Sequence, residues 1–198
     1  VYIPSVSPNI TTNANAIYGN LAASVQVRGG SAAFFEVIDM QIETGSAFDQ
    51  AAVQAQTPNV VIDKNTQKTF FKAGENPIGK ILLIKNVPAR IIGIAKDKAN
   101  SFGSNDRLNV WMPYTTVASR LTGNSYLQNI TVRVRDETSM RAAEAGMIDL
   151  LTEIHGKKDF FTSNSDSIRE TVEQTTQTMT LLISAIAVIS LIVGGIGV

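Results

Sequence analysis

The chain has 198 residues, enough for one domain of moderate size or for two small domains that each have a core. Its seventeen basic and seventeen acidic residues cancel, so no large net field points to nucleic acid or to anionic lipid headgroups. There is no cysteine, which excludes disulfides, thiol catalysis and thiolate metal sites. Charged residues make up only 17% of the chain, below the roughly 25% of soluble domains, and this deficit has a local cause at the C-terminal end.

The first part of the chain predicts a hairpin followed by a short helix. Residues 14–18 and 21–28 flank Gly19-Asn20, a favoured pair for a tight hairpin turn. Phe34 and Phe35 fall on the short helix, where we expect one ring to face the core and the other to point sideways. The polar, alanine-rich residues 50–56 are the expected domain boundary.

Beyond that boundary, strands and helices alternate. The expected elements are a strand over 59–62, a helix over 65–71, a hairpin of strands 80–84 and 89–95, a strand over 109–112, a helix over 115–121, a strand over 130–135 and a helix over 139–155. The order predicts an α+β fold in which residues 49–126 form a small unit. That unit is inserted into a first unit made of residues 1–48 and 127–164.

The end of the chain has the composition of a membrane-spanning helix. Residues 179–198 are apolar except for one threonine and two serines, and about 20 such residues are needed to cross a bilayer. We expect this helix to be cut off inside the membrane. Ser190 and Gly194 form a small-xxx-small pair, which either lets another helix approach closely or reflects the ordinary tolerance of membrane helices for glycine.

A polar stalk is predicted just before the span. Ser167 and Glu170 fit a capping box, with Ser167 as the N-cap and Glu170 bonding back to it. No glycine or proline interrupts residues 157–193, so one helix runs from a stalk over residues 165–178 into the membrane. Because a continuous helix is stiff, a tilt of its membrane segment would reach the outer domain.

Residues 74–80 have the spacing GxxxxGK of a phosphate-binding loop, but the context argues against nucleotide binding. Such a loop continues with Ser or Thr into a helix, whereas Ile81 follows here in a predicted strand. Pro77 also removes one of the amides that would bind phosphate. We interpret the segment as a Pro-Gly turn.

His155 is the only histidine, and it lies in the last turn of a helix that Gly156 ends. A cation there favours the helix C-terminus, which indicates a capping role. A metal site or a general base would need partners that the sequence does not supply. We therefore expect no catalytic, cofactor-binding or metal-binding residue in this chain.

Two aromatic residues are candidates for contact with a partner or a transported solute. Phe102 is the one apolar side chain in the polar loop of residues 100–105, although it could instead pack on the neighbouring hairpin. Phe34 is the second candidate, if it is the exposed member of its pair.

Several long segments resemble the periplasmic core of MacB-type transporters, which belong to the FtsX-like permease group. They read GENPIGKILLIKNVPARIIGIA from Gly74, SFGS from Ser101, VWMPYTTVASRLTG from Val110, NITVRVRD from Asn129, HGKKDFFT from His155 and AVISLIVGGIGV from Ala187. Together they extend over most of the chain, and several are too long to match by chance.

The resemblance implies a place in a larger machine. Members of this family carry a cytoplasmic ATP-binding cassette that uses ATP and Mg, four membrane helices, and a periplasmic domain between the first two. They form homodimers in the bacterial inner membrane and drive a tripartite pump with a MacA-type periplasmic adaptor and a TolC-type outer-membrane duct. Their substrates include macrolides, peptides and protein toxins.

The resemblance also implies that residues 1–48 and 127–164 form a porter-like subdomain whose opening strand and helix are missing here. This chain itself would neither bind nor hydrolyse ATP. Two other kinds of membrane protein share the expected stalk and span: an FtsX-type regulator of cell-wall hydrolases and a lipoprotein-release permease. A binding-only receptor domain is the remaining alternative.

Overall fold

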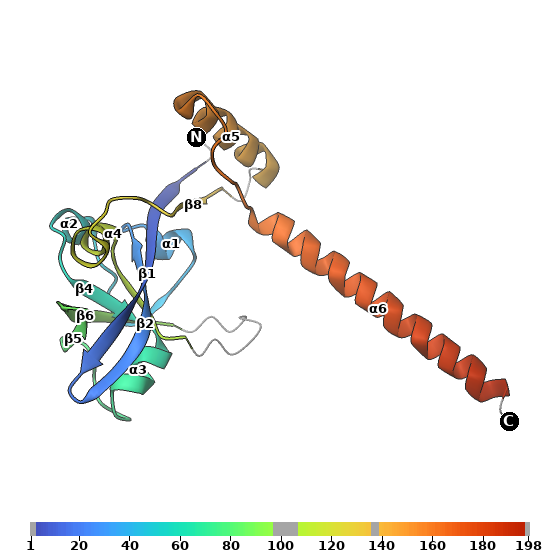
Figure 1. Cartoon of the computed structure of the whole chain (residues 1–198), viewed down its shortest axis with the longest axis horizontal. Coiled ribbons are helices and arrows are strands. Elements are labelled where there is room, and N and C mark those ends of the chain that lie inside the picture. Colours follow the sequence, from blue (N-terminus) through green and yellow to red (C-terminus); the bar gives the residue numbers. More distant parts are fainter. Residues whose placement is uncertain (1–2, 97–106, 136–138, 197–198) are drawn as a thin grey trace. The chain divides into compact units, whose positions relative to one another are not determined.

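The computed structural model describes residues 3–96, 107–135 and 139–196, and it separates into two compact units (Figure 1). The first unit extends from Ile3 to Arg135 and is called the barrel unit here. The second extends from Asp136 to Val198 and is called the helical unit. The predicted α+β class is confirmed, since strands and helices are mixed in the first unit and the second ends in a long apolar helix.

The barrel unit contains eight described strands and four short helices. The strands are β1 (Ser5–Tyr18), β2 (Leu21–Gly30), β3 (Ile42–Gly45), β4 (Asn59–Ile62), β5 (Ile81–Ile84), β6 (Val87–Ala95), β7 (Asn109–Pro113) and β8 (Asn129–Arg133). The helices are α1 (Phe34–Val37), α2 (Gln50–Gln54), α3 (Lys64–Phe70) and α4 (Tyr114–Thr116), and a π-helical turn (Val117–Thr122) continues α4. The helical unit consists of α5 (Met140–His155), α6 (Ser165–Ile196) and the segment that joins them.

Six of the strands close into a ring in the order β1, β2, β7, β4, β6, β5, with β5 pairing back onto β1. The β2–β7 and β4–β6 pairs are parallel, and the other four pairs are antiparallel. β3 adds to β6 outside the ring, and β8 pairs with the first residues of β1. Closure pairs every strand of the ring on both sides, so the ring itself has no free edge.

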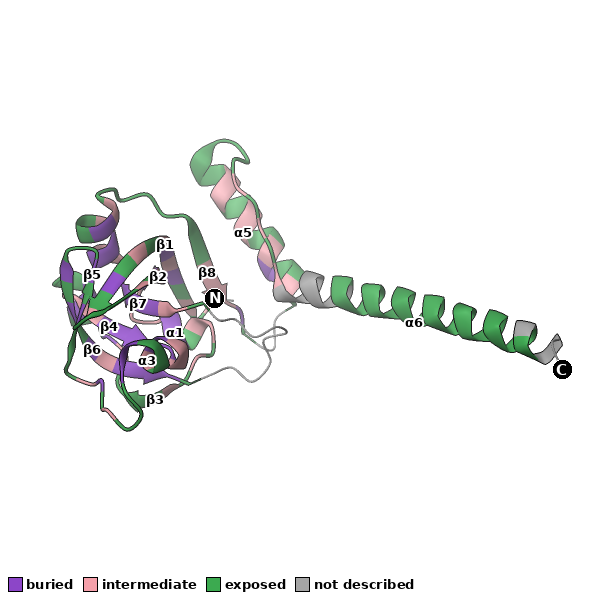
Figure 2. Ribbon diagram, turned by 60° about the horizontal axis from the view of Figure 1, so that its bottom comes forward, coloured by how far each residue is buried: buried purple, intermediate pink, exposed green. Residues whose placement is uncertain are grey.

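Strand alternation produces two apolar clusters, one inside the ring and one outside it. Val60 and Val110 point inward and are fully buried in the larger cluster. Val61 and Trp111 lie between such inward residues and point outward, where they pack with Phe35 and with α2. Figure 2 shows buried residues along β4, β6 and β7. The barrel unit therefore buries apolar residues on both sides of β4 and β7.

Two glycines allow the end of β3 to approach β6 closely where the two strands pair. Gly45 has φ +82°, and a Cβ there would lie 2.1 Å from the carbonyl oxygen of Ile92. A Cβ on Gly93 would lie 2.5 Å from the carbonyl oxygen of Ser46. Both positions require glycine because the two backbones are in contact.

Several sequence predictions are confirmed by the structure. The hairpin around Gly19 joins β1 to β2, and the second hairpin joins β5 to β6 through a two-residue turn. The helix over 139–155 is α5, and Gly156 ends it with φ 71°, the left-handed conformation expected after a helix.

Residues 50–56, the expected domain boundary, are not an irregular connection, because Gln50–Gln54 forms helix α2. The side chain of Asp49 accepts a hydrogen bond from the backbone N–H of Ala52 at 2.8 Å and so caps the helix. Ala52 and Val53 are buried in the outer cluster. A polar, alanine-rich sequence here is an amphipathic helix with a small buried face.

The predicted domain boundaries also differ from those of the structure. β2 was expected in the first unit, yet it forms a parallel ladder with β7 in which Gln26 pairs with Asn109. β1 likewise pairs with β5, so residues 49–126 do not form a separate inserted unit. The boundary lies instead between Arg135 and Asp136. Ladders between strands some eighty residues apart leave no local signal in the sequence.

Candidate functional site

Helix α6 is a single helix that combines the predicted stalk and span. Among residues 3–96, 107–135 and 139–196, it is the one helix long and apolar enough to cross a membrane. The candidate span, Thr171–Ile192, has 22 residues, about 33 Å at 1.5 Å per residue, and none of it is buried. Leu181 is 72% exposed and Leu191 is 78% exposed, so neither side chain is packed in a core of the described chain.

The two candidate helix-packing residues lie one turn apart on α6. Ser190 is exposed, and nothing lies within 4 Å of a Cβ placed on Gly194. Their spacing puts both on the same side of the helix. Their role in helix packing stays a prediction.

Threonines at the start of the candidate span bond to their own helix. The hydroxyls of Thr175, Thr176, Thr178 and Thr180 each donate to the carbonyl oxygen four residues earlier, at 2.8 to 2.9 Å. These hydroxyl groups therefore have an acceptor whether water or lipid surrounds them.

The predicted stalk cap is wrong in position. The helix begins at Ser165, so Ser167 lies in its first turn and is not the N-cap. The side chains of Ser167 and Glu170 lie outside the described part of the structure. Asn164 directly precedes the helix and belongs to a residue type favoured at N-caps. A tertiary contact to Glu144 holds Asn164 in place, and a local sequence pattern could not reveal that contact.

Glu144 on α5 holds the start of α6. One of its carboxylate oxygens accepts a hydrogen bond from the hydroxyl of Thr162 at 2.6 Å, and the other accepts one from the side-chain amide of Asn164. These two hydrogen bonds, with a smaller contribution from Lys158, lower the pKa of Glu144 below its usual value. We call this arrangement the Glu144 clamp.

A second contact holds the same connecting segment at the other end of α5. Nδ1 of His155 lies 2.8 Å from a carboxylate oxygen of Asp159, and this hydrogen bond lowers the pKa of Asp159. The ring of Phe160 packs edge-on against His155, with ring centroids 6.0 Å apart. His155 thus orders the connection in addition to ending the helix. Residues 157–164 run back along α5 between the two contacts, as Figure 1 shows.

The aromatic candidates are not brought together as a surface. Phe34 and Phe35 are each only 5% exposed, and their rings pack edge-on with centroids 5.6 Å apart. Phe35 also contacts Phe48 and Trp111, so both rings belong to the outer cluster and Phe34 is unavailable to a partner. Both are buried because α1 lies against strands that already present Trp111 outward. Phe102 lies outside the described residues.

The loop with GxxxxGK spacing is a turn held by a carboxylate. Gly74 and Gly79 both have positive φ. The hydroxyl of Tyr18 donates to Glu75 at 2.9 Å, which raises the pKa of Tyr18 and lowers that of Glu75. The backbone N–H of Lys72 donates to the other oxygen of Glu75 at 3.2 Å. A carboxylate in this position repels phosphate, which supports the turn interpretation.

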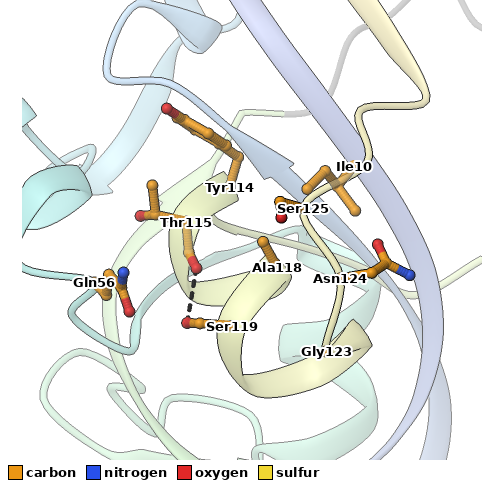
Figure 3. Close-up of a pocket in the computed structure, with 9 residues that line it drawn as sticks. All are labelled: Ile10, Gln56, Tyr114, Thr115, Ala118, Ser119, Gly123, Asn124 and Ser125. Carbon is orange, nitrogen blue, oxygen red and sulfur yellow. Dashed lines mark hydrogen bonds between the residues drawn. The ribbon is translucent and has the colours of Figure 1, made fainter.

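A cavity of about 350 Å³ opens beside the π-helical turn (Figure 3). It is lined by Ile10, Gln56, Tyr114, Thr115, Ala118, Ser119, Gly123, Asn124 and Ser125. The hydroxyl of Ser119 donates to the carbonyl oxygen of Thr115 at 2.8 Å. No lining side chain is charged, so this cavity offers no acid, base or nucleophile pair. No group of three or more metal-ligating side chains occurs in the described part of the chain.

A strand-rich domain followed by an exposed helix of membrane length fits the outer part of a membrane protein. Comparison with known proteins identifies which kind. Residues 3–150 match the MacB-like periplasmic core domain, and the chain belongs to this family.

Curated relatives agree with this assignment. The chain is 53% identical over 197 residues to the macrolide export ATP-binding/permease protein MacB of Acinetobacter baylyi, and 49% identical to MacB 2 of Yersinia pestis biovar Antiqua. Each alignment covers all of this chain but only 30% and 29% of the relative. The chain thus spans less than a third of the length of these curated relatives.

Solved structures share the fold. The crystal structure of the periplasmic region of MacB from Actinobacillus actinomycetemcomitans superposes with a TM-score of 0.76 at 34% identity, covering 87% of this chain and 77% of the other. The extracellular domain of the ABC-type transporter YknZ from Gram-positive bacteria superposes with a TM-score of 0.65 at 18% identity, over 79% of each chain. This second likeness shows the fold alone.

Proposed function

We propose that this chain is the periplasmic domain of an ATP-driven tripartite efflux transporter. In this proposal the parent protein binds ATP and Mg in a cytoplasmic cassette, and the chain described here does neither. The parent forms a homodimer in the inner membrane and works with a MacA-type adaptor and a TolC-type duct. Its cargo would be macrolides, peptides or toxins already in the periplasm.

The observation that carries the proposal is the connection between α5 and α6. Helix α6 continues without a break through the candidate span, and the Glu144 clamp fixes the residue that precedes it. A movement of the membrane segment would therefore pull on α5 directly. Such a connection suits a protein that transmits the work of ATP hydrolysis and does no chemistry of its own.

The test uses the full-length parent protein reconstituted in lipid, with a purified MacA-type adaptor. We expect the adaptor to bind at micromolar concentration or tighter and to stimulate ATP hydrolysis. Replacing Glu144 with Ala should leave basal hydrolysis unchanged and reduce the stimulation, because the clamp is broken while the cassette is intact. Failure of the wild-type protein to bind any adaptor would contradict the proposal and favour an FtsX-type regulator.

A further inference from the structure

An apolar stripe crosses the outside of the barrel in strand register. Ile17 on β1 is paired with Ala22 on β2 and with Leu83 on β5, and Leu83 is in turn paired with Pro88 on β6. Directly paired residues of antiparallel strands point to the same face. These four residues therefore form one continuous row over four strands, and Ile81 lies beside the row on the same face of β5. We call these five residues the apolar stripe.

The stripe lies on the outer face of the ring, so its side chains do not belong to the core inside the ring. Its neighbours Leu82 and Ile84 point inward and are fully buried, as alternation requires. Ile17 and Leu83 are each 36% exposed and Ile81 is 46% exposed. The outward positions of an antiparallel hairpin are normally polar, so a row of apolar side chains there needs another reason.

Three basic side chains lie on the β5–β6 side of the stripe. Lys80, Lys85 and Arg90 lie on or beside the same hairpin, and all three are exposed. The sequence has no acidic residue between Glu75 and Asp97. Lys85 also donates to the carbonyl oxygen of Leu121 at 2.9 Å, which holds its side chain in place. Glu75 interacts with Lys80, so this side of the stripe carries three basic groups and one nearby carboxylate, a net positive charge.

We propose that the apolar stripe is a docking surface for a protein partner that presents an apolar patch flanked on one side by carboxylates. Protein interfaces have this anatomy, with a desolvated apolar centre and a polar rim, and complementary charge raises the association rate. The stripe is a row of short, paired side chains on a regular sheet, so it suits another folded surface. The inference rests on the proposed function, because the partner used to test it is the adaptor.

The test measures binding of a purified MacA-type adaptor to the full-length parent protein. Leu83→Asp places a charge at the centre of the stripe and should weaken binding by tenfold or more, about what the loss of an interface anchor costs. Arg90→Glu should weaken binding less and should remove part of its dependence on salt. Leu127→Asp is the matched control, since Leu127 is 43% exposed in the same unit but lies off the stripe, and it should change binding less than twofold.

The outcomes separate the inference from the proposed function. If the wild-type protein does not bind the adaptor, the proposed function fails. If the wild-type protein binds the adaptor and both the Leu83→Asp and the Arg90→Glu variants bind it as tightly as the wild type, the docking surface is overturned while the proposed function stands. A third arm adds phosphatidylglycerol vesicles to the full-length protein held in lipid nanodiscs, so that α6 is embedded before the vesicles are added. If Leu83→Asp abolishes vesicle binding but leaves adaptor binding unchanged, the surface is a lipid-binding face and the inference is overturned. Because Leu83 points outward, an unchanged thermal midpoint shows that the variant is folded.

Discussion

The barrel unit and the helical unit are stabilised in different ways. The barrel closes its hydrogen bonds in a ring and buries two apolar clusters. In the helical unit, the described contacts of the segment between α5 and α6 include the hydrogen bonds that Glu144 accepts from Thr162 and Asn164 and the one between His155 and Asp159. Leu150 and Ile154 on α5 are large apolar side chains, yet both are exposed. The barrel is thus a body with its own core, and the helical unit is a connector with polar joints.

The two units also differ in charge. Residues 1–135 contain thirteen basic and eight acidic residues, and residues 136–198 contain four basic and nine acidic residues. The overall balance therefore conceals an excess of five positive charges in one unit and five negative charges in the other. A net charge of zero excludes a uniform field, but it does not exclude two local ones.

The largest expected effect concerns the interior of the barrel. Leu82→Ala removes a fully buried side chain and should lower the free energy of unfolding by about 2 to 5 kcal/mol. Leu83→Ala, one residue along and outward, should lower it by less than about 0.5 kcal/mol. Denaturation of the chain in detergent, followed by the fluorescence of the single Trp111, measures both variants. Equal losses would mean that the outward face is also part of a core.

The close pairing of β3 with β6 gives the next largest effect. Gly45→Ala combines a positive φ with a Cβ that would overlap the Ile92 carbonyl, and it should cost about 3 kcal/mol. Gly74→Ala has a similar φ of +85° but open space around the Cβ, so about 1 kcal/mol is expected. The same fluorescence measurement compares them. A Gly45 variant as stable as the Gly74 variant would show that the two backbones are not in contact.

Two helix caps, one buried and one exposed, test how much buried polar contacts contribute to the stability of the barrel. Asp63 is 8% exposed; it caps α3 through the N–H of Thr66 and accepts two further hydrogen bonds from Asn109, at 2.9 and 3.0 Å. Asp63→Ala should cost about 2 kcal/mol, because Asn109 also loses its acceptor. Asp49→Ala removes a single exposed cap and should cost about 1 kcal/mol. A reversed order in the denaturation midpoints would contradict this account.

The smallest effect is expected in the helical unit and depends on pH. The pKa of Glu144 is lowered in the folded state, so the clamp contributes stability above the unfolded value of 4.5 and loses it as the pH falls through the lower folded pKa. Amide hydrogen exchange near residues 162–164 should therefore speed up in that acidic range. Glu144→Gln should remove this pH-dependent increase in the exchange rate.

Asp159→Asn serves as the control for the clamp, because the pKa of Asp159 is also lowered and it titrates in the same direction. That substitution should leave the pH-dependent increase at residues 162–164 in place. If Asp159→Asn removed the pH-dependent change in exchange and Glu144→Gln retained it, the change would belong to Asp159, which would contradict this account.

Local patterns in the sequence predicted most of the elements but not their assembly. The Gly19-Asn20 turn, the hairpin around Lys85 and the glycine after His155 are short-range signals, and each element that they indicate is present. The membrane helix was readable because its composition is unusual over some twenty residues. Ring closure, by contrast, depends on pairings such as Gln26 with Asn109, which no local pattern encodes.

The candidate site was harder to predict for the same reason. Phe34 looked available because neighbouring aromatic residues on a helix usually point in different directions, yet Trp111 and Phe48 make room for both rings. Glu144 went unnoticed because its partners lie eighteen and twenty residues away and are an ordinary threonine and asparagine. The register of the apolar stripe likewise became visible only once β5 was known to pair with β1.

The threonines of α6 have one more consequence. Since Thr175, Thr176, Thr178 and Thr180 already satisfy their hydroxyl groups within the helix, moving them between water and hydrocarbon costs less than moving an unpaired polar group. These threonines therefore cost little to place on either side of a membrane boundary. Gln174 and Gln177 lie among them, and their side-chain amides are costly to place in hydrocarbon.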